Sequence, residues 1–293
     1  MKKIQLQGKF LPWILLILLS FIWGSSFILM KKGLTAFSYQ QVATLRVFIA
    51  FLVLLPFTIS HIFKIPKKYW IYLLLAAYLG NGFPPFLFTK AQTYLSSSMA
   101  GILNALTPLF TFIFGIIIFK TATRWYRFLG VILGLIGAVG LLLSSGGNYF
   151  DNLAYGTYVV LATICYALGT NIVKKYLQGI NPLHITGFFF FVTGLPLGVY
   201  LFTTDFLTIM TTHEEAYHAL GFIALLAIFG SALSLVLWNT LIQKTDAVAA
   251  SSVTYIMPVF AIMWGLFDGE QFLLIYIPML ILILIGVYLS GKK

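Results

Sequence analysis

Apolar runs follow one another along almost the whole chain, and they restrict its fold more than any other feature. A helix needs about 20 predominantly apolar residues to cross the hydrocarbon core of a bilayer. Hydrophobic residues make up 60% of the chain and charged residues 9%, whereas a soluble domain has about 25% charged residues. The sequence therefore predicts an all-α integral membrane protein. Ten transmembrane helices are expected, at roughly 11–30, 40–60, 69–89, 96–119, 126–145, 153–173, 183–202, 219–241, 247–267 and 272–290.

The joins between these runs are short, so we expect no extramembrane domain. The longest polar stretch is 203–218. The start of the chain resembles a signal peptide in outline, with basic residues before an apolar run. That run is too long and lacks a small-residue cleavage site, which favours a retained first span. A functional site is therefore expected among the helices.

The basic residues indicate how the chain crosses the membrane. With the N-terminus in the cytoplasm, 14 of the 18 Lys and Arg residues fall on the inner side. The outer side then holds Lys31, Lys32 and Lys90. Because cytoplasmic loops carry an excess of Lys and Arg, both termini are predicted to be cytoplasmic. The net charge of +11 then reflects topology, and no basic groove with stacking aromatics indicates nucleic-acid binding.

The opening span recurs in the second half of the chain. "FIWGSSFILMKKGL" (21–34) aligns with "TICYALGTNIVKKYL" (163–177), 143 residues further on. This alignment pairs Trp23 with Tyr166 and Ser26 with Gly169. It also pairs the two adjacent lysines at 31–32 with those at 174–175.

A second match continues over more of the chain, at an offset of 150 residues. "LAAYLGNGFPPFLFTKA" (75–91) aligns with "LLAIFGSALSLVLWNTL" (225–241). The same offset pairs "ALTPLFTFIFG" (105–115) with "YIMPVFAIMWG" (255–265). The matched pairs include Gly80 with Gly230, Asn81 with Ser231, Phe88 with Trp238, Pro108 with Pro258, and Ser96 with Asp246, the last two being predicted N-caps.

These matches predict two five-helix repeats, at 1–148 and 149–293. Five is odd, so the second repeat begins on the opposite side of the membrane and is inverted. The lysine pairs agree, since 31–32 fall outside and 174–175 inside. Inverted repeats around a site at the midplane are typical of secondary transporters.

The same segments resemble a known family. "WGSSF", "LRVFIAFLVLLP", "ALTPLFTFIFG" and "WNTLIQKTDAVAASSVTYIMPVFAIMWGLFDGEQF" are similar to EamA-type members of the drug/metabolite transporter superfamily. The resemblance implies ten helices, cytoplasmic termini and movement of small metabolites, often outward, with amino acids frequent among them. One departure is that "KTATRW" (120–125) lacks an acid often found after the fourth span.

Polar and aromatic residues within the spans are the candidates for substrate contact, because a polar group at that depth needs a partner. Gly24, Ser25 and Ser26 place only small side chains on one side of the first helix. These small residues either allow close packing with another helix or leave room for Trp23 to face a cavity. The amide side chains within the spans either form interhelical hydrogen bonds or contact the substrate. The predicted cavity residues are Trp23, Ser26, Tyr78, Asn81, Asn104, Tyr166, Asn171, Trp238, Thr254 and Tyr255.

Arg46 is the cation placed well within a predicted span. Three interpretations stay open: it snorkels to the surface, it has a structural or gating role, or it binds an anionic group of the substrate. Pro108 and Pro258 are predicted to be paired bends in moving helices, with inert kinks as the alternative.

Other kinds of function have little support in the sequence. One cysteine, Cys165, and no Cys/His cluster argue against a metal or cofactor. A lipid-modifying enzyme is an alternative, but its only candidate cluster is His213, Glu214, Glu215 and His218, whose histidines miss the i, i+4 spacing of a zinc pair. No catalytic residue is predicted.

A transporter of small molecules such as amino acids is the leading hypothesis, with nucleotide-sugar or drug-type carriers as alternatives. Amides and aromatics suit an amphiphilic zwitterion, and the absence of a mid-membrane acid favours facilitated movement. The expected partners are a small-molecule substrate and the lipid bilayer, with Gly130-x3-Gly134 indicating close packing or a homodimer face. The expected location is a bacterial inner (plasma) membrane.

Overall fold

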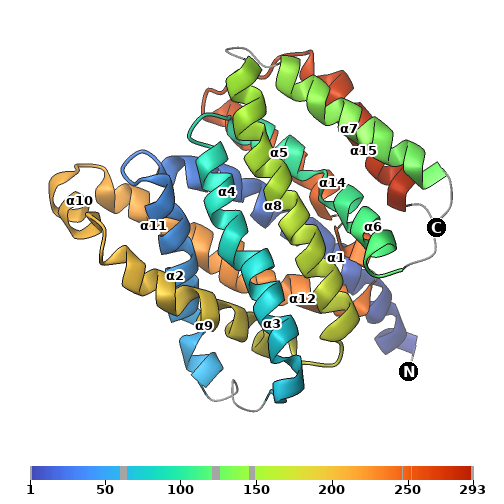
Figure 1. Ribbon diagram of the computed structural model, residues 1–293, viewed down its shortest axis with the longest axis horizontal. Helices are drawn as coiled ribbons and strands as arrows, with labels where there is room; N and C mark the ends of the chain where they lie inside the picture. The colour runs from blue at the N-terminus through green and yellow to red at the C-terminus, as the bar shows by residue number, and fades with distance from the viewer. Residues whose placement is uncertain are drawn as a thin grey trace.

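The computed structural model describes residues 2–59, 65–120, 126–144, 149–245, 247–251 and 253–291. Within these ranges every regular element is helical and no strand occurs. Figure 1 shows the helices as one bundle, with the α7–α15 pair at one edge and the short α10 at the opposite edge. The elements are α1 (Lys2–Gly33), α2 (Tyr39–Ile59), η2 (Lys67–Tyr69), α3 (Trp70–Ala77), η3 (Tyr78–Gly82), α4 (Phe83–Ala91), α5 (Ser97–Asn104), α6 (Thr107–Ile117), α7 (Tyr126–Ser144), α8 (Tyr149–Tyr176), α9 (Pro182–Leu201), α10 (Phe206–Thr212), α11 (Ala216–Ala227), η4 (Ile228–Leu233), α12 (Ser234–Lys244), α13 (Ala247–Ser251), α14 (Val253–Phe267) and α15 (Tyr276–Gly291).

Seven helical segments are long and apolar enough to cross a membrane. They are Trp13–Gly33, Tyr39–Ile59, Lys67–Ala91, Ser97–Ile117, Asn152–Tyr176, Pro182–Leu201 and Ala216–Lys244. The other three expected spans coincide with the shorter apolar helices Leu129–Leu141, Val253–Phe267 and Tyr276–Gly286. The all-α prediction is therefore confirmed for the described residues, while the count of ten spans stays a prediction.

Two of the long segments change from α-helix to π-helix near their middle. The π-helical turn η3 separates α3 from α4, and η4 separates α11 from α12. Both turns contain a glycine, at Gly80 and Gly230. A π-helical turn inserts extra backbone into an α-helix and is frequent at functional sites. Both turns border the cavity described below.

The fourth expected span is broken between α5 and α6. Pro108 lies in the first turn of α6 and cannot donate a hydrogen bond to the carbonyl of Asn104. Thr107 Oγ1 donates to that carbonyl instead, at 2.8 Å. Pro258, by contrast, lies inside the continuous helix α14. The sequence predicted bends at both prolines, but the two matched positions differ in local structure.

The capping prediction at the start of α5 is confirmed, because the Ser96 side chain accepts a hydrogen bond from the backbone N–H of Met99 at 3.1 Å. Its predicted counterpart, Asp246, lies outside the described residues. The polar stretch 203–218 contains the short helix α10. Phe206 buries its ring against Phe37, with ring centroids 5.8 Å apart.

The helices α7 and α15 pack closely through glycine. A Cβ atom added to Gly286 of α15 would lie 2.5 Å from the carbonyl oxygen of Gly130 and 2.5 Å from the amide nitrogen of Gly134. The Gly130-x3-Gly134 spacing therefore serves packing within one chain, and association between copies stays a prediction.

Candidate functional site

A cavity lies between the long helices, at the level of the two π-helical turns. Its volume is about 90 Å3, which is small beside the roughly 300–1,000 Å3 of ligand pockets. A substrate larger than a few heavy atoms would therefore require its walls to move. Eight of the predicted cavity or gating residues line it, namely Trp23, Ser26, Arg46, Asn81, Asn104, Tyr166, Trp238 and Thr254.

Trp23 joins α1 to the π-helical turn η4. Its Nε1 donates to Ser234 Oγ at 2.9 Å and to the Gly230 carbonyl at 3.2 Å. Its ring meets Trp238 edge to face, with centroids 5.1 Å apart. A buried indole usually needs a partner for its N–H, and the irregular backbone of η4 supplies one. Trp23 is thereby fixed as an aromatic wall of the cavity.

The three small residues after Trp23 have different roles. Gly24 faces α14, where an added Cβ would lie 2.6 Å from Phe260 Cβ. The Ser25 hydroxyl accepts a hydrogen bond from Trp264 Nε1 at 2.8 Å, while Ser26 lines the cavity. Both interpretations of this segment hold, because its first two residues serve close packing and its third borders the cavity.

Arg46 is buried, with 8% of its surface exposed, so it does not snorkel to the surface. Its Nε donates to Ser231 Oγ at 2.7 Å, and one Nη donates to the Gly230 carbonyl at 3.4 Å. The other Nη points to Met30 Sδ at 3.7 Å. Among the described residues no carboxylate forms an ion pair with Arg46. A guanidinium has five N–H donors, so this cation lines the cavity with unused hydrogen-bonding capacity.

Two amide side chains at the cavity wall have atoms that lack partners among the described residues. These atoms are Asn81 Nδ2, a donor, and Asn239 Oδ1, an acceptor. Asn104 is better satisfied, because its Nδ2 approaches Met257 Sδ at 3.6 Å and its Oδ1 accepts from Thr107 Oγ1 at 3.3 Å. Buried polar atoms normally have a partner, and a polar solute in the cavity would provide one.

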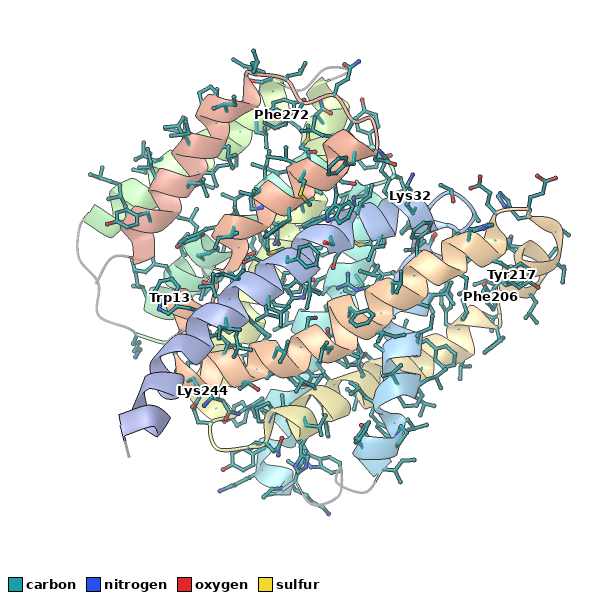
Figure 2. All side chains as sticks on the ribbon, turned by 180° about the vertical axis from the view of Figure 1, so that it is seen from behind. Trp13, Lys32, Phe206, Tyr217, Lys244 and Phe272 are labelled. Carbon is teal, nitrogen blue, oxygen red and sulfur yellow. The ribbon has the colours of Figure 1, made fainter. Side chains whose placement is uncertain are left out.

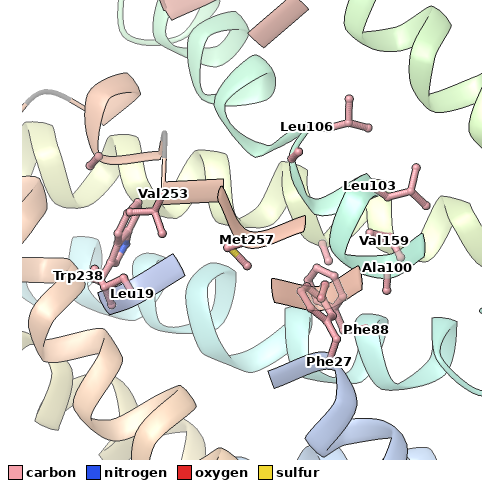
Figure 3. Close-up of a cluster of buried hydrophobic side chains, with 14 of the residues drawn as sticks. Leu19, Phe27, Phe88, Ala100, Leu103, Leu106, Val159, Trp238, Val253 and Met257 are labelled. Carbon is pink, nitrogen blue, oxygen red and sulfur yellow. The ribbon is translucent and has the colours of Figure 1, made fainter. Parts of the chain in front are cut away.

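Aromatic and apolar side chains line the cavity together with the polar ones. Phe88 stacks on Tyr166 at a centroid separation of 5.9 Å and approaches Phe27 at 5.8 Å. Figure 3 shows Phe27 and Phe88 side by side, and Trp238 close to Leu19 and Val253. The site therefore combines a cation, amides and hydroxyls with flat aromatic surfaces.

Three predicted residues do not line this cavity. The Asn171 amide donates to the Thr111 carbonyl at 3.0 Å and to the Ala167 carbonyl at 2.9 Å, which is the interhelical bond of the structural interpretation. Tyr78 is 41% exposed on the outside of the bundle. Tyr255 is half-buried and lies outside the lining set. Position within a predicted span alone did not distinguish these side chains from the side chains that line the cavity.

Comparison with known proteins identifies the class of this molecule. The sequence profile described as "EamA-like transporter family" matches residues 11–143 and again residues 155–291. The chain belongs to the EamA-like transporter family. It is accordingly a membrane transporter of the drug/metabolite type, and the resemblance seen in its motifs is confirmed.

Relatives of this EamA-like transporter occur in bacteria, plants and archaea. The "uncharacterized inner membrane transporter YedA" of Escherichia coli K12 is 28% identical over 257 residues, covering 83% of this chain and 78% of that protein. A "WAT1-related protein, chloroplastic" of Arabidopsis thaliana is 27% identical, covering 97% and 70%. An "uncharacterized transporter" of Archaeoglobus fulgidus is 25% identical, covering 96% and 99%.

A solved crystal structure shares the fold of this EamA-like transporter. It superposes with a TM-score of 0.63 at 14% identity, covering 97% of this chain and 96% of the other. At that identity the likeness concerns the fold alone.

Several lining residues of the transporter were not among those predicted from its sequence. They include Ser234, the hydrogen-bond partner of Trp23, and Asn239, with its unpaired amide oxygen. Asn239 lies near the end of the span expected at 219–241, but the helical segment continues to Lys244. The polar run Trp238–Asn239–Thr240 was the available signal for a functional position there.

Proposed function

We propose that this protein is a secondary transporter that moves small metabolites such as amino acids outward across a bacterial plasma membrane by alternating access. The observation that carries the proposal is the cavity, in which Arg46 has no carboxylate partner among the described residues and two amides have unpaired atoms. The outward direction follows from the family resemblance. The family matches favour a transporter and give no support to the alternative of a lipid-modifying enzyme. The residues that such an enzyme would use, His213, Glu214 and Glu215, are exposed.

The cavity chemistry favours a substrate with a carboxylate. Arg46 would bind that group, since a guanidinium recognises carboxylates in a bidentate manner. Trp23, Tyr166 and Trp238 offer ring faces and edges to an ammonium or an apolar side chain. Asn81 offers a donor and Asn239 an acceptor. The volume of about 90 Å3 favours an amino acid over a nucleotide sugar, even after the walls have widened.

We further propose that the chain has ten transmembrane helices in two inverted repeats, 1–148 and 149–293. Ring contacts support this arrangement, because Trp23 contacts Trp238 while Tyr166 contacts Phe88. Trp23 matches Tyr166 and Phe88 matches Trp238, so the two contacts are the same contact with the repeats exchanged. Close approaches at glycine repeat the pattern, with Gly230 beside Ser26 and Gly169 beside Gly80.

The π-helical turns support the repeat proposal independently. The turn η3 begins at Tyr78 and η4 begins at Ile228, which are 150 residues apart. This is the offset at which the sequences match. Two halves with the same internal contacts can exchange conformations, and that exchange would open the cavity first to one side of the membrane and then to the other.

Counterflow in proteoliposomes tests the transport function. Vesicles are loaded with unlabelled amino acids, and uptake of each labelled amino acid is recorded with and without a proton gradient. We expect accelerated uptake of a subset without a gradient, and none in protein-free vesicles. If folded protein accelerates the uptake of none of them, the amino-acid class is wrong, and nucleotide sugars or drug-like cations become the substrates to test.

The proposed topology predicts which surface sites are accessible from each side. Lys244 and Thr93 are exposed and do not line the cavity. Figure 2 shows Lys244 near the opposite end of α1 from Lys32. In a Cys165→Ala background, Thr93→Cys should react with a membrane-impermeant maleimide added to intact cells. Lys244→Cys should react only after permeabilisation. The reverse pattern would overturn the cytoplasmic placement of the termini.

A further inference from the structure

Charged side chains form a network where α1 ends. Lys31 Nζ lies 2.9 Å from Glu270 Oε1 and 3.1 Å from Asp268 Oδ2. Lys32 forms an ion pair with Asp268. Only 4% of the Glu270 side chain is exposed. We call Lys31, Lys32, Asp268 and Glu270 the end clamp. In the proposed topology it lies at the extracellular end of the helix bundle.

Glu270 also binds the N-terminus of α5. Its Oε1 accepts from the backbone N–H of Ser97 at 2.8 Å. Its Oε2 accepts from the backbone N–H of Ser98 at 3.1 Å and from the Ser98 hydroxyl at 2.9 Å. The first N–H groups of a helix lack partners within the helix and favour an anion. One carboxylate thus joins three helices, with α1 contributing a lysine, α5 its N-terminus and α14 the chain that leads to Glu270.

The turn after α14 brings this carboxylate back to α5. Gly269 has φ +79°, a left-handed conformation that glycine adopts without strain. The next N–H, that of Glu270, donates to the Gly265 carbonyl at 2.9 Å. This hydrogen-bonded turn is a common way for a helix to end. It fixes the direction of the Glu270 side chain, so the clamp is part of the folded end of α14.

The positions that match Glu270 and Lys31 in the other repeat carry different chemistry. At the offset of 150, Glu270 corresponds to Lys120, a residue of opposite charge. Lys31 corresponds to Lys174, whose Nζ donates to the carbonyls of Ile242 and Thr245. These carbonyls belong to the end of α12 and the residue after it. Among the described residues, Lys31 therefore binds carboxylates and Lys174 binds backbone carbonyls, so charges of opposite sign meet only at the end of the bundle where Lys31 lies.

We propose that Glu270 is a positioning residue for transport. It holds closed the end of the helix bundle where Lys31 lies (the Lys31 end) and thereby sets the resting state of the carrier. The inference rests on the proposed function, since alternating access gives each end an open and a closed state. Opening the Lys31 end must separate α1, α5 and α14, which breaks the hydrogen bonds that join Glu270 to Lys31, Ser97 and Ser98. The opposite end has no equivalent carboxylate at position 120. The resting carrier is therefore closed outside and ready to load from the cytoplasm.

The electrostatics of Glu270 indicate that ordinary pH changes do not open this end. Burial by itself would raise the pKa of Glu270, but hydrogen bonds from Lys31, Ser97 and Ser98 outweigh it and lower the pKa below its usual 4.5. Asp268, whose pKa burial would also raise, has a lowered pKa through Lys32 and Lys31. A lowered carboxylate pKa means that the clamp is intact above pH 4.5 and is lost only as the pH falls through the lower folded-state value.

The test measures how fast a cysteine in the cavity reacts from outside. Thr170 lines the cavity, and Thr170→Cys is placed in a Cys165→Ala background and treated with a membrane-impermeant methanethiosulfonate, without substrate. Glu270→Gln keeps the side-chain shape and removes the charge. It should accelerate labelling from outside by about tenfold and slow labelling from inside. Glu215→Gln, an exposed carboxylate outside the clamp, is the matched control and should change neither rate.

Lys31→Gln provides a second variant that leaves the bonds between Glu270 and α5 in place. It should also accelerate outside labelling, and the double variant should add little, because the two residues act as one unit. Unchanged rates in both variants would overturn the proposal. Faster labelling from both sides together with a lower Tm would also overturn it, by showing a loosened fold. The labelling test needs no substrate. Its result can therefore be interpreted even if the counterflow experiment shows that amino acids are not the substrates.

Discussion

Replacing Arg46 with glutamine is expected to weaken the binding and transport of carboxylate-bearing substrates strongly while the protein still folds. The shorter amide side chain can still donate to Ser231 Oγ, which now accepts from Arg46 Nε at 2.7 Å. It cannot supply the charge that would bind a carboxylate in a water-poor cavity. Removing one partner of a buried charge pair costs roughly 2–5 kcal/mol, so the apparent affinity should fall by about 100-fold. Counterflow with R46Q protein measures this loss.

The choice of substrate makes the Arg46 experiment specific. An amino acid amide, which lacks the carboxylate, should be affected much less by R46Q. Arg46→Lys keeps the charge but loses the planar fork. Its transport activity should therefore lie between that of the unchanged protein and that of R46Q. Lys90→Gln is the matched control, because Lys90 stacks over Tyr39 away from the cavity lining. An equal loss for the acid and its amide, together with a lower Tm, would assign Arg46 a structural role.

The largest expected effect on folding comes from Gly286→Ala. The added methyl would lie 2.5 Å from the Gly130 carbonyl oxygen and 2.5 Å from the Gly134 amide nitrogen. These are backbone atoms, so the whole of α7 must shift rather than a flexible side chain. Overpacking costs typically about 1–3 kcal/mol, and the high value is expected here. Thermal unfolding of the purified protein in detergent should show a clearly lower Tm.

Gly221→Ala is the matched control for this substitution. Gly221 also lies within a helix, α11, but an added Cβ would have no atom within 4 Å. Alanine stabilises a helix by roughly 0.5–1 kcal/mol relative to glycine, so the Tm should stay equal or rise. A similar decrease for both variants would mean that helix flexibility, and not the α7–α15 contact, explains the importance of these glycines.

The length of the apolar runs was enough to predict where the helices lie, because a bilayer leaves a spanning segment few choices. The direction of a side chain on its helix was harder to predict. Asn81 and Asn171 are both amides within predicted spans, yet Asn81 lines the cavity and Asn171 binds the Thr111 carbonyl. Each position depends on which neighbouring helix faces it, and no sequence window contains that information.

Arg46 shows the opposite situation, in which a single residue type is informative. A cation in the middle of an apolar run must find partners, so the sequence predicted that it matters and left three roles open. The structure excludes snorkelling, because only 8% of the residue is exposed. Asn239 was missed because the predicted span ended at 241, which placed it near a span end, whereas the helical segment continues to Lys244. Ser234 was missed because a serine within an apolar run is a weak signal, and its role is visible only in its hydrogen bond from Trp23.

The two π-helical turns also set the rotational phase of the helices that follow them. A π-helical turn adds about one residue to a regular α-helix, and one residue corresponds to a rotation of roughly 100°. Phe88 and Trp238 follow η3 and η4 respectively, and both face the cavity. Deleting a single residue within η4 would restore an unbroken α-helix and rotate α12, so that a residue now directed at lipid would enter the cavity. Such a one-residue deletion would thus rebuild the transport site more thoroughly than any single substitution, because every side chain downstream in that helix would change its neighbours together.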